Sequence, residues 1–188
     1  MSKYRNNLQK YLLTLECLNS PSFESKIINI ANIIKKNFIN HKKIIVIGNG
    51  GSSAMSDHFV TELTCKYKKL RKPYNALTLN LPSSITAWSN DFEFKSFYSR
   101  QIDALGNRGD ILLILTTSGG TINKQSSNLF LAAKSAKKKG IKIFTLSGKK
   151  KGSLDKLSDQ IIKVKSNETP VVQLAHQFIL DQFCEILN

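Results

Sequence analysis

Cysteine and long apolar runs are scarce in this sequence. Only three of the 188 residues are cysteines, Cys17, Cys65 and Cys184, and no C-x-x-C pair occurs. This excludes a disulfide framework and a cysteine zinc knuckle, and it fits a reduced, cytoplasmic protein. No apolar run approaches the roughly 18 residues that a membrane span needs. Because the N-terminus is polar and of mixed charge, we expect neither a signal peptide nor a membrane partner.

Acidic residues are also few. Thirteen Asp and Glu stand against 28 Lys and Arg, which gives a formal net charge of +15. Such an excess favours an anionic partner, whether a phosphorylated metabolite, a nucleic acid or an acidic protein. The excess is mostly lysine in a chain rich in isoleucine and asparagine, so it can equally follow from genome base composition. Charge alone therefore does not choose a function.

The hydrophobic pattern predicts an α/β fold. Residues 1–40 have helical spacing, broken at "NSPSFES", where Ser20 or Ser22 is a candidate N-cap. This predicts an N-terminal helical hairpin before a core over 41–188, within a single domain of 1–188. In the core, β-rich runs at 42–49, 73–80, 109–117, 140–148 and 159–166 alternate with helical stretches near 52–70, 84–105, 121–139, 152–158 and 168–187. The alternation predicts a three-layer α/β/α sandwich around a five-stranded parallel sheet.

The glycine-rich loops for nucleotides are missing. Neither G-x-G-x-x-G nor a Walker A loop occurs, so a triphosphate site is not expected. The first strand ends instead in "GNGGSS", which includes Asn49, Gly50, Gly51 and Ser52. Glycines there allow a ligand to approach the backbone, and the following helix offers free N–H groups to an anion. A tight strand-to-helix turn is the alternative explanation.

A second loop of this kind, "TTSGGT", follows the third strand. Its hydroxyl groups belong to Thr116, Thr117, Ser118 and Thr121, and each can donate to a phosphate oxygen. A Thr N-cap beside a glycine turn is the plainer alternative. Hydroxyl and N–H donors without a lysine suit the phosphate monoester of a sugar, and the ends of parallel strands share one sheet edge.

Two helices carry the candidate acid–base groups. His58 and Glu62 are four residues apart and therefore share a helix face, which suits a metal or acid–base pair but also an exposed surface pair. On the last helix, Gln173, His176, Gln177 and Asp181 form a polar stripe among apolar residues.

The segment "WSNDFEF" adds an Asn-Asp pair, Asn90 and Asp91. The two side chains can bind sugar hydroxyls, or they can simply cap a helix.

The motifs "GNGGS", "HFVTEL", "NDFEF", "SRQIDALGNRGDILL", "TTSGGT" and "GIKIFTLSGKKKG" together resemble the SIS (sugar isomerase) domain family. More narrowly, the chain resembles the sedoheptulose 7-phosphate isomerases, or phosphoheptose isomerases, over nearly its whole length. The resemblance implies a homotetramer with active sites between subunits, a phosphorylated sugar substrate and a bound Zn²⁺ ion.

The same resemblance assigns roles to individual residues. Substrate-binding positions are Asn49, Gly50, Gly51, Ser52, Glu62, Asn90, Asp91, Thr116, Thr117, Ser118, Thr121 and Gln173. The implied zinc ligands are His58, Glu62, Gln173 and Asp181, and the implied catalytic residues are Glu62, Asp181 and His176.

One position departs from the family pattern. Eight residues after the glutamine that matches Gln173, the family has a histidine that binds metal and transfers protons, whereas this chain has Asp181. His176 matches a different family histidine. Aspartate can also ligate zinc and transfer protons, so a more acidic site is expected.

The expected function is isomerisation of sedoheptulose 7-phosphate to D-glycero-D-manno-heptose 7-phosphate for lipopolysaccharide or capsule synthesis. Two alternatives remain open. One is a non-catalytic SIS-domain protein that binds a phosphosugar, DNA or a replication-initiation protein, and the other is an isomerase of a different phosphosugar. Glu62 favours the enzyme, because the regulatory branch of the family lacks the catalytic glutamate.

Overall fold

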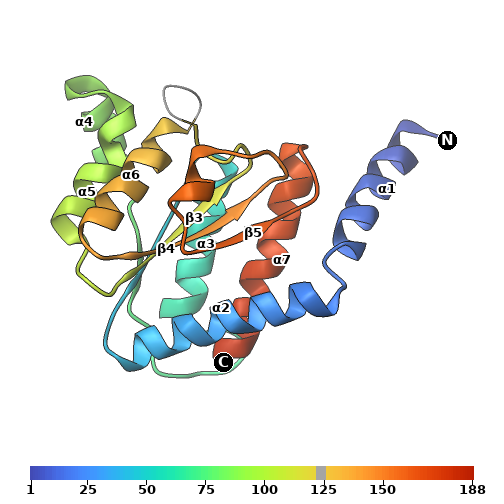
Figure 1. Ribbon diagram of the computed structural model, residues 1–188, viewed down its shortest axis with the longest axis horizontal. Helices are drawn as coiled ribbons and strands as arrows, with labels where there is room; N and C mark the ends of the chain where they lie inside the picture. The colour runs from blue at the N-terminus through green and yellow to red at the C-terminus, as the bar shows by residue number, and fades with distance from the viewer. Residues whose placement is uncertain (122–125) are drawn as a thin grey trace.

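A five-stranded parallel sheet forms the centre of the protein (Figure 1). The computed structural model describes residues 1–121 and 126–188. The strand order is β2-β1-β3-β4-β5. The strands are β1 (Ile44–Gly48), β2 (Ala76–Thr78), β3 (Ile111–Thr116), β4 (Lys142–Ser147) and β5 (Gln160–Lys163). The five predicted strands are therefore confirmed, although β2 is shorter than the run that predicted it.

Side chains of the sheet alternate between two cores. Ile44, Val46 and Leu113 belong to one core, whereas Ile45 and Leu112 belong to the other. All residues of β1 and β3 are buried, which is why these strands read as continuous apolar runs. The three-layer prediction is confirmed.

Helices cover both faces of the sheet. The first core includes side chains from α2 (Pro21–Ile39), α3 (Gly51–Thr64) and α7 (Thr169–Leu187). The second includes side chains from α5 (Phe97–Leu105) and α6 (Ser127–Lys138). No helix in the described parts of the chain is long and apolar enough to cross a membrane.

Helix α2 begins where the sequence predicts. The Ser20 side chain accepts a hydrogen bond from the Phe23 N–H at 3.3 Å and caps α2. Helix α1 (Lys3–Glu16) extends away from the body of the protein (Figure 1). Its residues Leu8, Leu12 and Leu13 remain exposed.

Several helix boundaries differ from the predictions. Helix α3 ends at Thr64 rather than near 70, because the Arg71 guanidinium donates to the carbonyl oxygens of Glu62 and Leu63 at 2.8 and 2.9 Å. The stretch 84–105 is broken at Phe92, whose backbone is extended, into α4 (Pro82–Asp91), η1 (Phe94–Ser96) and α5. The stretch 152–158 is the short 3₁₀ helix η2 (Ser153–Lys156).

The topology fixes where a ligand can bind. From β1 the chain moves outward to β2 and then returns to the other side of β1 as β3. Ligands of open α/β sheets bind at such a reversal, outside the carboxyl ends of the strands. The two loops singled out in the sequence, after β1 and after β3, both lie at this point.

Candidate active site

A pocket of about 280 Å³ lies beyond the carboxyl ends of β1 and β3. Seven of the predicted substrate-binding residues line it: Asn49, Gly50, Gly51, Ser52, Thr116, Thr117 and Gln173. The first residues of α3 and α7, Gly51 and Thr169, are part of the wall, and Ser126 precedes α6 there. Because helix N-termini present free N–H groups and positive dipole ends, this pocket suits an anion.

Two asparagines join the loop after β1 to the start of α6. Asn49 Nδ2 donates to Asn128 Oδ1 at 3.0 Å, and Asn128 Nδ2 donates to Asn49 Oδ1 at 2.8 Å. Asn128 Oδ1 also accepts from the Leu129 N–H at 3.0 Å. Both side-chain amides are therefore committed to holding the pocket wall in place. Asn128 was not among the residues predicted from the sequence, because no spacing to Asn49 indicated this contact.

The loop after β3 is held by its own hydroxyl groups. The Ser118 N–H donates to Thr116 Oγ1 at 3.3 Å, and Ser118 Oγ lies 3.4 Å from Ser126 Oγ. Ser126 has a left-handed backbone with φ of 66°, an uncommon conformation for a residue other than glycine. Ser118 thus supports a wall residue but does not line the pocket itself.

Gln173 comes from the start of α7 and closes the pocket against α3. A Cβ at Gly51 would lie 2.6 Å from Gln173 Nε2, so the end of this flexible side chain lies directly against the glycine. The first loop and Gln173, both predicted to bind substrate, therefore lie against each other in the structure.

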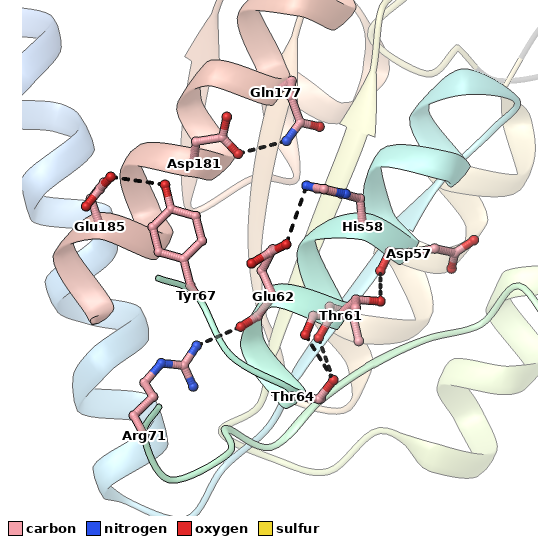
Figure 2. A network of polar contacts seen from close by, with 11 residues as sticks. Asp57, His58, Thr61, Glu62, Thr64, Tyr67, Arg71, Gln177, Asp181 and Glu185 are labelled. Atoms are coloured by element: carbon pink, nitrogen blue, oxygen red, sulfur yellow. Dashed lines mark hydrogen bonds and ion pairs between the residues drawn. The ribbon is translucent and has the colours of Figure 1, made fainter. Parts of the chain in front are cut away.

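The candidate acid–base groups lie between α3 and α7. His58 and Glu62 project from α3, and Gln177 and Asp181 project from α7 toward them (Figure 2). His58 Nε2 is 3.8 Å from Glu62 Oε1, and Gln177 Nε2 donates to Asp181 Oδ1 at 2.8 Å. The glutamate side chain is 25% exposed, compared with 55% for the histidine. A partly shielded carboxylate of this kind can take up a proton from a bound substrate.

Buried Cys184 lies next to the same carboxylates. Burial, and to a lesser degree the charges of Glu62 and Asp181, raise the pKa of its thiol to about 12. A thiol with such a pKa stays protonated at neutral pH and is a poor nucleophile. The chemistry of this region therefore rests on its carboxylates.

The predicted zinc ligands do not converge in this arrangement. Over residues 1–121 and 126–188, no three His, Cys, Asp or Glu side chains are grouped closely enough to hold a metal ion. His58 and Glu62 are paired, but Asp181 is bonded to Gln177, and Gln173 contacts Gly51 instead. These side-chain positions do not fit a preformed zinc centre, so no reaction step is derived from one.

Some predicted residues lie elsewhere. Asn90 and Asp91 are exposed at the end of α4, where Asn90 Nδ2 donates to Asp91 Oδ1 at 2.7 Å, and neither lines the pocket. Thr121 also lies outside the pocket lining, and its neighbours 122–125 fall outside the described residues.

His176 is fully buried on the sheet-facing side of α7. It lies among core residues and does not line the pocket, because the stripe of Gln173, Gln177 and Asp181 occupies another face of the helix. Burial lowers the pKa of its imidazole to about 4, and the Ser147 backbone opposes this shift only in part. Neither ring nitrogen makes a hydrogen bond within the described residues. A neutral, enclosed ring is not placed to exchange protons with a ligand in the pocket.

The family follows from comparison with known proteins. The family model for the SIS domain matches residues 3–148. The chain therefore belongs to the SIS domain family.

Within this family, the chain is similar to phosphoheptose isomerases. The chain is 39% identical over 150 residues to the phosphoheptose isomerase of Campylobacter concisus, covering 79% of this chain and 77% of that protein. It is 37% identical over 164 residues to a probable phosphoheptose isomerase of Thermoplasma acidophilum, covering 87% of each. The phosphoheptose isomerase structure from Francisella tularensis matches with a TM-score of 0.89 and 28% identity, covering 100% of this chain and 98% of that one.

Burial of neutral His176 predicts a pH-dependent stability. The unfolded chain binds a proton at His176 below about pH 6.5, whereas the folded protein binds it only below about pH 4. The free energy of unfolding should therefore fall as the pH is lowered from about 6.5 to about 4, by up to about 3 kcal/mol. Urea denaturation of wild type and His176→Leu across this range would measure it. His58→Gln is the exposed control, and an unchanged slope in His176→Leu would contradict the assignment.

Proposed function

We propose that this protein is an aldose–ketose isomerase that converts sedoheptulose 7-phosphate to D-glycero-D-manno-heptose 7-phosphate in the cytoplasm. The product would supply heptose for a surface polysaccharide, lipopolysaccharide or capsule. The proposal rests on the arrangement of the pocket relative to the candidate acid–base groups. A pocket of hydroxyl, amide and helix N-terminal donors lies where α3 and α7 begin, and the same two helices carry Glu62 and Asp181 farther along on facing sides. The identity to phosphoheptose isomerases supports the choice of substrate.

The two parts of the site have different tasks. The loop from Thr116 to Ser118 would hold the phosphate, so that binding energy far from the reacting carbons positions the sugar chain. Asn49 to Ser52 and Gln173 would bind the sugar hydroxyl groups. An isomerase changes neither the phosphate nor the distant hydroxyl groups of its substrate. The protein groups that bind them therefore serve only to orient the substrate.

The reaction moves protons within the substrate. Glu62 would remove a proton from C1 of the ketose, and the C1–H electrons would form the C1–C2 double bond of an enediol while the carbonyl oxygen gains a proton. Glu62 would then return its proton to C2 as the C1 hydroxyl loses one, which leaves an aldose with no net change in atoms. Asp181 would transfer the proton between the two oxygens. Zinc at His58, Glu62, Gln173 and Asp181 stays a prediction, and these steps use the side chains alone.

Replacing the proposed base separates binding from turnover. Glu62→Gln should lower the isomerisation rate at least about a hundredfold, because an amide cannot accept the C1 proton. The dissociation constant for sedoheptulose 7-phosphate should change less than about threefold, because the pocket donors are untouched. The assay measures aldose formation with added zinc and with a chelator, and Glu16→Gln is a surface control. Turnover that survives in Glu62→Gln would exclude this base.

Restoring the family residue tests the role of Asp181. Asp181→His should raise kcat if the aspartate is a weaker proton donor at this position than the histidine of the family. Asp181→Asn, which keeps the shape and cannot exchange a proton, should lower it. Equal rates in all three proteins would rule Asp181 out of proton transfer.

We infer a homotetramer with active sites between subunits. Asn90 and Asp91 are exposed outside the pocket of their own chain, and apolar side chains of α1 and α7, including Leu12, Leu174 and Phe178, are also exposed. Contact with other subunits would cover such a surface. Light scattering after size exclusion should give about four times the 21.1 kDa of the chain. A monomer mass at micromolar concentration would contradict the assembly.

A further inference from the structure

The tetrapeptide Lys-Lys-Lys-Gly occurs twice, at 137–140 and at 149–152, on either side of β4. The first copy ends α6 and precedes β4, so it lies at the amino edge of the sheet. The second follows β4 at the carboxyl edge, where the pocket lies. One short sequence thus occupies opposite ends of one strand, and only one copy is near the candidate site.

Glycines at both ends of the second copy, Gly148 and Gly152, allow it to pack closely against the proposed phosphate loop. A Cβ at Gly148 would lie 2.5 Å from the carbonyl oxygen of Thr117, and one at Gly119 would lie 3.0 Å from the Cα of Gly152. The chain beyond is fixed as well, because the Ser153 N–H donates to the Gly120 carbonyl oxygen at 3.0 Å. Lys149–Lys151, which lie between Gly148 and Gly152, are called the lysine turn below. It therefore runs alongside Thr117 to Gly119 with its backbone held in place.

The lysine turn adds positive charge beside the pocket. No charged side chain is among the described residues that line the pocket. The lysines of the turn are exposed, and none forms an ion pair within 1–121 and 126–188.

Neighbouring acids do not cancel this charge. Asp155 is paired with Lys163 at 2.5 Å, and Glu168, just before the pocket residue Thr169, is paired with Lys10 at 2.9 Å. The positive charge of the turn is therefore left to act on whatever binds in the loop beside it.

We propose that the lysine turn is a specificity determinant for the dianion of a phosphate monoester seated in the pocket. It acts through the field of its three charges, while the hydroxyl and N–H groups of the loop make the direct hydrogen bonds. The inference rests on the proposed function only in taking a phosphosugar as the ligand. It adds that the affinity for the phosphate depends on residues outside the pocket lining.

The repeated tetrapeptide provides a matched experiment. One variant changes Lys149, Lys150 and Lys151 to Gln, and its control changes Lys137, Lys138 and Lys139 to Gln, so both remove three charges from the chain. Calorimetry with sedoheptulose 7-phosphate should show a dissociation constant about fivefold weaker for the first variant at about 50 mM salt, and less than about twofold weaker at about 0.5 M. The control should bind like wild type at both salt concentrations. Replacing the same turn lysines with arginine should restore the affinity.

Each other outcome has a defined meaning. Equal weakening of the two glutamine variants would show an effect of net charge and overturn the proposal, as would wild-type affinity in the turn variant. Unphosphorylated sedoheptulose should bind all proteins alike, and a loss confined to the turn variant would indicate altered shape instead and also overturn it. Tight, turn-dependent phosphosugar binding without isomerisation would refute the proposed enzyme and leave the role of the lysine turn standing. Wild-type protein that binds no phosphosugar would refute both.

Discussion

Backbone packed directly against backbone at the carboxyl edge of the sheet is the constraint on which the site depends. Gly148 contacts the Thr117 carbonyl, Gly152 contacts Gly119, and a Cβ at Gly48 would lie 2.7 Å from Ser52. The loops after β3 and β4, which are distant in the sequence, thereby share a space that leaves no room for side chains at these positions, and the loop after β1 is packed as tightly against the first turn of α3. The contacts fix the pocket walls without a ligand, which lowers the cost of ordering them when a substrate binds.

The proposed binding groups and the proposed catalytic groups occupy different parts of the site. Neutral donors form the pocket, whereas the carboxylates lie farther along α3 and α7 (Figure 2). An acidic group within the pocket would repel a phosphate. Placing the carboxylates between the helices, outside the pocket lining, avoids this conflict.

Periodicity and loop composition were enough to predict the fold and much of the pocket. Apolar runs located all five strands because both faces of the sheet are covered, and the glycine and hydroxyl loops located the walls. Contacts between distant segments were beyond the sequence. Nothing in it paired Asn49 with Asn128, or showed that Arg71 folds back to end α3, since both depend on tertiary packing. The family resemblance implied a catalytic role for His176, yet the core encloses its ring.

Helix α7 carries two parts of the candidate site. Gln173 near its start lines the pocket, Asp181 two turns later lies on the side toward α3, and the opposite side is buried in the core through Ile179 and Phe183. A slide or rotation of this helix would move together the Gln173 amide, proposed to bind the sugar, and the Asp181 carboxylate, proposed to transfer protons. The repacking of a residue far from the pocket can therefore change substrate affinity and turnover in concert, because one element carries both.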